Sequence, residues 1–476
     1  MSPKLPKRQA ERRGLRLWRI GVVLPLTFMI TVGVATVVFY AGWVLLGVRG
    51  LKPERRIDSE TLFDLVKLSF GVVAGAGALV ALVVAYRRQR VDEDAALRDA
   101  TRLHTERFTT AVSQLGDESA AVRLGGVHAL AGLADDAPTR ELRQTCVDVL
   151  CAYLRLPYTA EADLPAGDAE ARHSYLALRE VRLTIIRLIR DHLRLEPDHL
   201  HSWQGHDLDF TTVTFEGGDF SGIGVSGGTI SFSSAIFLCG TVDFTATKFS
   251  GGTVDFSAAQ FSGGTVDFRD AQFPGGTVLF GAGSGSGGAV VSSGVIAFSK
   301  ATFSGGIISF RGIQLLGGSL DFRGAQFSGS MVDFNLAVFS GGAANFLSEF
   351  SGGKVDFSGA RFSGSAVDFY GSGINDNAVF RGGTVCFGDA NFSGSAVNFR
   401  HAEFYSGGMV DFRGARFTGG TVDFSAAVFN SGDSTDFRGA RFAGGAVEFS
   451  GTIGAAPRGL ASPNGLPPYV RLPSHW

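Results

Sequence analysis

The sequence predicts a chain in three parts: a transmembrane α-hairpin, a small all-α segment and a long solenoid of stacked β-strands. Two uncharged apolar stretches, each long enough to cross a bilayer, lie before residue 90 and predict the hairpin. All but five of the 41 phenylalanines lie beyond Leu200, where they recur at a regular spacing. A fixed spacing of this kind is the signature of a repeat architecture.

The composition of the 476 residues excludes several broad classes of protein. The 66 glycines keep no three-residue period and there are only 14 prolines, which excludes collagen. With 45% hydrophobic residues the chain can bury a core, which excludes intrinsic disorder. A formal net charge of −2 argues against a dedicated nucleic-acid binder. Four cysteines without a paired motif exclude a disulfide scaffold and suit a reducing compartment.

Residues 20–48 and 68–86 are the two predicted membrane spans, which place the hairpin in residues 20–90. About 20 apolar residues cross the hydrocarbon core, and one central charge costs roughly 2.5–3.5 kcal/mol. A cleaved signal peptide and a buried core helix are the alternatives. The first stretch is longer than the apolar part of a signal peptide, and a second stretch follows it. We therefore expect the lipid bilayer to be one partner of the chain.

Basic residues around the hairpin predict its orientation. Residues 1–19 form a basic N-terminus with seven lysines and arginines, and Arg87, Arg88 and Arg90 follow the second span. Short segments rich in lysine and arginine stay on the cytoplasmic side of a membrane. We therefore predict a multi-pass protein of the cell (inner or plasma) membrane, with its N- and C-terminal regions in the cytoplasm.

Residues 91–205 are predicted to form a small helical segment. Gly116 ends one helix, Asp117 or Ser119 caps the next, and residues 139–154 and 169–195 carry apolar residues at helical spacing. The stretches AVRLGGVHALAGLADD and RQTCVDVLCAYLR resemble an armadillo or HEAT helical pair. This resemblance implies a small, armadillo/HEAT-like all-α fold for the segment.

The cysteines and histidines of this segment match no metal-binding motif. Cys146 and Cys151 are five residues apart on one predicted helix, which is no zinc spacing, and they are interpreted as core residues. Four histidines cluster just before the repeats. We interpret them as part of a solvated linker that partly caps the repeats, with a metal site as the alternative. The four are His192, His199, His201 and His206.

The phenylalanines beyond residue 230 are spaced alternately by 5 and 7 residues, so the repeating unit is twelve residues long. Residues 249–260, FSGGTVDFSAAQ, are one such unit. An irregular insert near residues 281–294 interrupts the pattern, which then continues to Phe449. We predict that residues 206–453 form the repeat domain and residues 454–476 a proline-rich tail. The first run is Phe232, Phe237, Phe244, Phe249, Phe256, Phe261, Phe268, Phe273 and Phe280.

Alternation within each unit predicts which side chains are inside. Val254 stands two places before Phe256, and residues i and i−2 of a strand point to the same side. Both are expected inside, with Asp255 and Ser257 outside, and the paired glycines turn corners at positive φ. If two units make one coil, Phe256 lies over Phe280 in an aromatic column, because coils stack about 4.8 Å apart. Around ten coils would then form a rod of roughly 50 Å.

Both ends of such a rod need a cover, because an exposed terminal coil presents open strand edges. We expect the helices before Leu208 to cover the first coil. The tail, with Leu466, Tyr469 and Trp476, is expected to cover the last coil.

The segments VDFSA and AQFSG resemble units of the pentapeptide-repeat family, which have a bulky apolar centre and a small residue two places earlier. The resemblance covers residues 208–449. The helical stretch before them is similar to the region between membrane anchor and repeats in many bacterial pentapeptide-repeat membrane proteins. The resemblance implies a right-handed quadrilateral parallel β-helix with one pentapeptide on each face. A glycine–threonine pair inserted after AQFSG departs from the plain five-residue period.

The sequence assigns no catalytic, cofactor-binding or metal-binding residue. Gly283, Gly285 and Gly288 match GxGxxG, but a predicted strand follows them instead of the helix that a phosphate site needs. The aspartates of the VDF segments are interpreted as an outward solubilising ladder. We therefore expect no enzymatic activity, no cofactor and no small-molecule substrate.

Two functions are weighed for the repeat domain. The favoured hypothesis is a membrane-anchored, non-enzymatic scaffold that binds a protein partner along its rigid surface, with Arg413, Arg416 and Arg438 as candidate contacts. The resemblance implies the alternative, because some pentapeptide-repeat proteins mimic DNA and protect DNA gyrase from quinolones. From Asp207 onward there are 21 acidic and 15 basic residues, a net charge of −6, which is a low charge density for a DNA mimic. We therefore expect no nucleic-acid partner.

Overall fold

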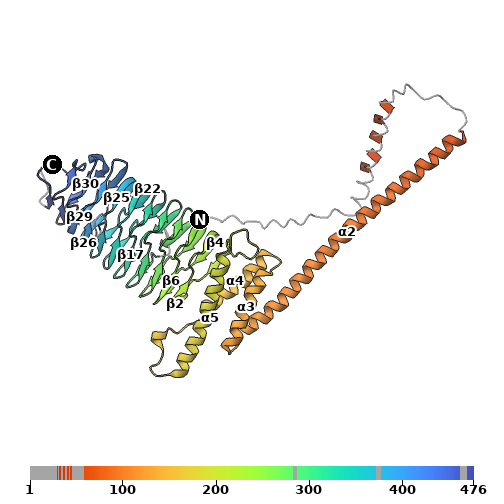
Figure 1. Cartoon of the computed structure of the whole chain (residues 1–476), viewed down its shortest axis with the longest axis horizontal. Coiled ribbons are helices and arrows are strands. Elements are labelled where there is room, and N and C mark those ends of the chain that lie inside the picture. Colours follow the sequence, from red (N-terminus) through yellow and green to blue (C-terminus); the bar gives the residue numbers. More distant parts are fainter. Residues whose placement is uncertain are drawn as a thin grey trace, which may run out of the picture. The chain divides into compact units, whose positions relative to one another are not determined.

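The computed structural model of the chain describes residues 58–281, 287–370, 377–460 and 469–476, with scattered helical positions between 29 and 44. Contacts divide the chain into two compact units, Met1–Leu103 and His104–Trp476. The second unit contains a group of helices followed by the β-solenoid (Figure 1).

One helix, α2, runs from Ser59 to Leu115 without a break. It is the one helix in the described residues that is long and apolar enough to cross a membrane, by length and composition. Leu68, Phe70 and Leu82 are 70%, 71% and 69% exposed, so no protein core covers this apolar stretch. The second predicted span lies within α2. Most of the first span lies outside the described residues, and the predicted hairpin is not seen.

The same helix continues past residue 90, where the sequence analysis placed the end of the hairpin. Residues 87–115 contain no proline or glycine, and arginine, alanine and leucine are frequent among them. These residues favour a helical backbone. The second predicted span and the first helix of the helical segment are therefore one continuous helix.

Three further helices follow at the positions that the sequence predicts. They are α3 (Ala120–Asp135), α4 (Arg140–Leu154) and α5 (Ala169–Leu193), with a short 3₁₀ helix η1 (Glu161–Asp163). The side chain of Thr139 caps α4 by accepting a hydrogen bond from the Leu142 amide at 3.3 Å. Asp168 caps α5 by accepting from the amides of Glu170 and Ala171. Such caps satisfy amides that have no partner inside the helix.

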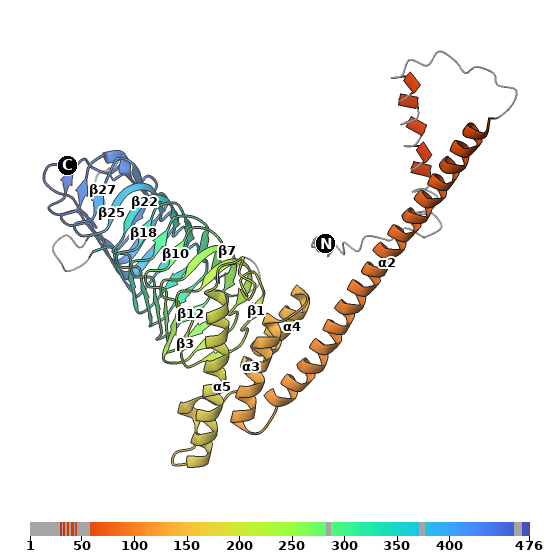
Figure 2. The same cartoon turned by 45° about the vertical axis from the view of Figure 1, so that its right-hand side comes forward.

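The repeats form a β-solenoid of about ten coils, built from short strands in two sheets of 16 and 19 strands (Figure 2). The first sheet contains β1 (Leu208–Asp209), β4 (Gly224–Ser231), β7 (Lys248–Asp255), β10 (Gln272–Phe273), β11 (Thr277–Gly281), β14 (Thr302–Phe303), β15 (Ile307–Phe310), β18 (Gln326–Phe327), β19 (Met331–Asp333), β22 (Glu349–Asp356), β25 (Val379–Cys386), β27 (Glu403–Phe404), β28 (Gly408–Asp411), β30 (Val428–Phe429), β31 (Thr435–Asp436) and β34 (Ile453–Gly454). The second contains β2 (Thr214–Phe215), β3 (Gly218–Asp219), β5 (Ile236–Phe237), β6 (Thr241–Asp243), β8 (Gln260–Phe261), β9 (Thr265–Asp267), β12 (Val290–Val291), β13 (Val295–Ala297), β16 (Gln314–Leu315), β17 (Ser319–Asp321), β20 (Val338–Phe339), β21 (Ala343–Asn345), β23 (Arg361–Phe362), β24 (Ala366–Asp368), β26 (Asn391–Asn398), β29 (Arg416–Asp423), β32 (Arg441–Phe442), β33 (Ala446–Glu448) and β35 (Val470–Arg471). A 3₁₀ helix, η2 (Gly432–Ser434), lies before β31.

Strands of successive coils pair in parallel, and their register confirms that two twelve-residue units make one coil. Val254 of β7 lies beside Val278 of β11, 24 residues further along the chain. Phe256 stacks on Phe280 with ring centroids 4.8 Å apart and planes 5° apart. This spacing equals the distance between hydrogen-bonded strands, so the backbone ladder places the rings at stacking distance. The predicted aromatic columns are therefore confirmed.

The insert near residue 281 leaves the columns in register. Val290 and Val291 of β12 pair with Gln260 and Phe261 of β8, so Val291 occupies a position that phenylalanine fills in the coil before it. Leu315 follows in the next coil. Neither residue is a phenylalanine, so the phenylalanine spacing does not reveal these two members of the column.

Two kinds of corner explain the alternating steps of 5 and 7 residues. The five-residue step crosses a tight turn, in which the Ala259 amide donates to the Phe256 carbonyl at 3.1 Å and Ala258 has a φ of 56°. The seven-residue step crosses a glycine pair. A Cβ on Gly251 would lie 2.4 Å from the Ser226 carbonyl oxygen, and Gly252 has a φ of 68°. The first glycine therefore permits close approach of two coils, and the second permits the left-handed backbone.

The outward side of the repeat differs from the prediction at two positions. Ser257 was expected outside but is 1% exposed, and Asp255 is half-buried. The side chain of Asp255 accepts a hydrogen bond from the Ser257 amide at 2.8 Å, which folds it over the turn. The expectation for Ser257 was wrong because simple alternation ends where the strand enters the corner.

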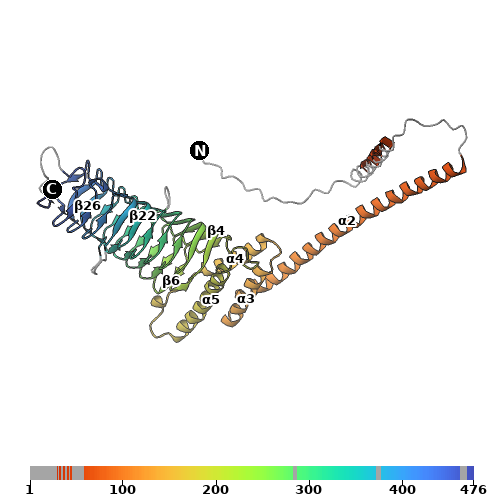
Figure 3. The same ribbon diagram turned by 45° about the horizontal axis from the view of Figure 1, so that its top comes forward.

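The helices cover the first coil, as predicted (Figure 3). Arg190 of α5 forms an ion pair with Asp219 of β3, and Arg194 Nε donates to the Ser221 carbonyl at 2.7 Å. Apolar side chains of α3, α4 and α5 belong to the same buried core as the phenylalanine columns. The helices therefore cover β1 and β3 of the first coil.

The C-terminal tail covers the last coil through Trp476. Its Nε1 donates to the Gly454 carbonyl at 2.8 Å, and its ring lies 5.6 Å from that of Phe429. Val470 adds a short strand beside Val447. The Tyr469 carbonyl accepts a hydrogen bond from the Val447 amide at 2.9 Å, while the residue is 44% exposed, and Leu466 lies outside the described residues.

Candidate functional site

The described residues contain no group of three or more His, Cys, Asp or Glu side chains that could hold a metal ion. Cys146 and Cys151 are buried, as the core interpretation predicts. The Cys146 thiol lies 3.8 Å from His104 Nε2, and burial raises the pKa of this thiol to about 11. A thiol with a raised pKa is a poor nucleophile near neutral pH.

The histidines before the repeats are held by polar contacts at the junction. His192 Nε2 and His201 Nδ1 lie 3.1 and 3.2 Å from Asp135 Oδ2, and Trp203 donates to the other oxygen of Asp135. His206 Nδ1 lies 3.0 Å from Gln144 Oε1, and burial lowers the pKa of His206 to about 4. These contacts join α3, α4 and α5 to the first coil and make the junction more ordered than a solvated linker.

The GxGxxG match leads into strands, as predicted. Gly283 and Gly285 lie outside the described residues, and Gly288 is followed by β12 and β13. No helix N-terminus follows to hold a phosphate.

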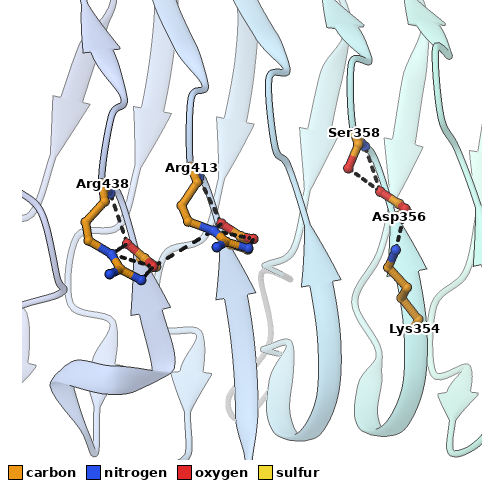
Figure 4. A network of polar contacts seen from close by, with 7 residues as sticks. Lys354, Asp356, Ser358, Arg413 and Arg438 are labelled. Atoms are coloured by element: carbon orange, nitrogen blue, oxygen red, sulfur yellow. Dashed lines mark hydrogen bonds and ion pairs between the residues drawn. The ribbon is translucent and has the colours of Figure 1, made fainter.

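The aspartates of the repeat cap turns. Asp411 and Asp436 each accept a hydrogen bond from the amide two residues later, those of Arg413 and Arg438, at 2.9 Å (Figure 4). This is an Asx turn, in which the carboxylate replaces a backbone acceptor. Asp411, which belongs to a VDF segment, is 5% exposed, so its interpretation as part of an outward ladder was wrong. Asp436, in the corresponding segment TDF, is 2% exposed.

Arg413 and Arg438 also bind these carboxylates with their side chains. Arg413 Nε lies 2.9 Å from both oxygens of Asp411, and Arg438 Nε lies 3.0 Å from both oxygens of Asp436. Although burial raises the pKa of Asp436, hydrogen bonds from Arg438 leave it below its ordinary value. Two of the three candidate contact arginines therefore already have a carboxylate partner.

A row of arginines on another face has no such partner. Arg416 lies beside Arg441 on one neighbouring strand and beside Asn391 on the other, and Asn391 lies beside Arg361. Arg361, Arg416 and Arg441 are exposed and form no ion pair within the described part of the chain. We call these three residues the arginine strip. Like charges on adjacent strands are destabilising, and an anionic partner would relieve that repulsion.

The sequence analysis identified one member of the strip, Arg416. The signal for the others was present, since each arginine stands directly before an inward phenylalanine. Only the register of the coils brings Arg416 and Arg441 side by side.

Comparison with protein-family models gives no match for this chain, and comparison with curated proteins gives none either.

Proposed function

We propose that this protein is a membrane-anchored, non-enzymatic member of the pentapeptide-repeat family whose solenoid is a docking surface for a protein partner. The arginine strip is the observation that carries the proposal, because its three charges are exposed and unpaired on a rigid face. Neighbouring coils hold the spacing of these charges through backbone pairing. A partner with an acidic surface complements this strip.

The proposed anchor is α2 together with residues 20–48. The exposed apolar side chains of α2 support its placement in the lipid bilayer. Outside a bilayer this large apolar surface would be in contact with water, which is unfavourable. The basic residues before the first span and after the second support the placement of both terminal regions, and so of the docking surface, in the cytoplasm.

Labelling with a membrane-impermeant thiol reagent tests this topology. In a Cys239→Ser background, intact cells are expected to label Ser59→Cys, which precedes the second span, and to leave Ser474→Cys unlabelled. Permeabilised cells provide the control, since both cysteines should then react. Labelling of Ser474→Cys alone in intact cells would reverse the topology and place the solenoid outside.

Charge reversal of the arginine strip tests the docking surface. The native chain, solubilised from membranes in detergent, is expected to capture a partner that Arg416→Glu/Arg441→Glu captures at least tenfold less. The reason is that the double substitution replaces two attractive charges with two repulsive ones. Lys248→Glu/Lys300→Glu is the matched control, because it makes the same change in charge at two exposed lysines away from the strip. Equal loss in both variants would reject the strip as the docking site.

The same preparations separate this function from mimicry of DNA. Acidic side chains such as Asp411 and Asp436 are buried and bound to arginines, which supports the scaffold over a mimic with a dense negative surface. We expect the full chain to give no protection of gyrase from a quinolone in a supercoiling assay. Protection at stoichiometric concentration would favour the DNA mimic instead.

A further inference from the structure

A pocket of about 490 Å³ lies in the helical part of the second unit. It is bordered by the C-terminal ends of α2 and α4, by α3 and by α5. Its volume lies in the range of small-ligand sites, which are mostly apolar with a few placed polar groups. The apolar lining consists mainly of Val112, Leu115, Val149, Leu156, Pro157 and Leu178.

Arg123 brings an unsatisfied donor to this pocket. Its Nε is buried and has no hydrogen-bond partner within the described residues. Leaving a buried charged donor without a partner costs more than leaving a neutral one. Water does not reach this Nε, but Arg123 as a whole is only half-buried and forms no ion pair within the described residues, so its charge can attract a ligand carboxylate.

Arg182 adds a second positive charge to the lining. It is 7% exposed, and it donates to the carbonyls of Leu154 at 2.6 Å and Thr214 at 2.7 Å. Both acceptors are neutral, and its guanidinium lies 4.3 Å from the ring of Tyr158. The nearby Glu216 is engaged by the hydroxyls of Tyr158 and Tyr175. Arg182 therefore has no carboxylate among its hydrogen-bond partners.

The one acidic residue of the lining does not neutralise these arginines. Asp117 is exposed, and its carboxylate accepts a hydrogen bond from the Ser119 amide at 2.8 Å. The pocket thus combines an excess of positive charge with apolar walls. A simple inorganic anion would leave the walls unused, and a neutral hydrocarbon would leave the charges of Arg123 and Arg182 without a counter-charge.

We propose that this pocket binds a small carboxylate with a hydrocarbon chain, with its carboxylate on Arg123 and its chain along Val112, Leu156 and Leu178. Such a ligand supplies a counter-charge for Arg123 and Arg182 and covers apolar side chains that water now contacts. The proposal is independent of the docking function of the solenoid. The sequence-based expectation was that the chain takes no small-molecule substrate. The proposed carboxylate is a bound ligand and is not chemically changed.

Titration calorimetry on the full chain in a neutral detergent, with sodium octanoate as the probe, tests the site. Octanoate is expected to bind at least tenfold more tightly than octan-1-ol, which has the chain without the charge. Acetate, which has the charge without the chain, is expected to give no binding. Arg123→Met should weaken octanoate binding at least tenfold while keeping an apolar side chain in place. Partition of octanoate into micelles is the same for every variant and cancels, and octanoate and octan-1-ol are compared at their free concentrations, measured with protein-free micelles.

Two further variants keep the test decisive if Arg123→Met unfolds. Leu178→Trp is expected to abolish octanoate binding by filling the pocket without a change in charge. Lys248→Gln removes one exposed positive charge from the solenoid and should leave octanoate binding unchanged. Failure of the native chain to bind octanoate, equal affinity for octanol, or full affinity in Leu178→Trp would each overturn the proposal.

Discussion

Substitution of Phe268 by aspartate is expected to unfold the solenoid around its coil. Phe268 is fully buried, and its ring stacks between those of Phe244 and Phe298 with centroids 5.0 and 4.8 Å away. Loss of a buried aromatic ring costs about 3–5 kcal/mol. An unpaired buried carboxylate adds several kcal/mol, so the total approaches the roughly 5–15 kcal/mol that holds a typical domain folded.

Circular dichroism during thermal unfolding of the purified chain measures this effect. Phe268→Leu is the matched control and should be clearly less destabilising, because it keeps an apolar side chain in the column and buries no charge. A melting temperature for Phe268→Asp within a few degrees of the native value would contradict the structural role of the aromatic columns.

The neighbouring Asp267→Ser is expected to be milder than Phe268→Asp but not neutral. Asp267 is 4% exposed, and it accepts hydrogen bonds from the amide and the side chain of Arg269. Hydrogen bonds to charged groups contribute about 1.5–3 kcal/mol. Serine can replace part of this cap, as Ser231 does for the Ser233 amide in another coil.

Removal of one complete coil is expected to leave a folded, shorter solenoid. Deletion of residues 249–272 joins Lys248 to Phe273, which then takes the position of Phe249 in the same column. Every later strand keeps its parallel register, because paired residues in this region are 24 positions apart. In a solenoid each repeat contacts only its neighbours, so the loss is limited to the contribution of one coil.

Deletion of five residues, 249–253, is expected to prevent folding of the solenoid from that point onward. Phe256 would then occupy the position of Gly251, where an added Cβ would lie 2.4 Å from the Ser226 carbonyl oxygen. The measurement is the soluble yield and the protease resistance of the two deletion variants, both of which should be much lower for the five-residue deletion. Similar losses in both would reject the coil of two units.

The repeat length and the inward residues were accessible from the sequence because both depend on local spacing. Phe244, Phe256 and the later phenylalanines recur at the regular intervals expected of stacked coils. Most have a small or β-branched residue two places earlier. Helix ends such as those at Gly116 and Thr139 were likewise local, since capping residues act within one turn. The unbroken course of α2 past residue 90 was predictable in principle from the absence of helix breakers.

Long-range placement decided the remaining features. Asp411 and Asp436 look like solvent-facing residues in the repeat, but the corner buries them and the adjacent Arg413 and Arg438 neutralise them. The strip that includes Arg416 exists only because residues 25 positions apart become strand neighbours. The pocket draws Arg123 and Arg182 from different helices, whose packing no local pattern encodes. Spacing within one repeat sets what is inside, whereas burial at corners and contacts between coils and helices set which charges are free to bind a ligand or partner.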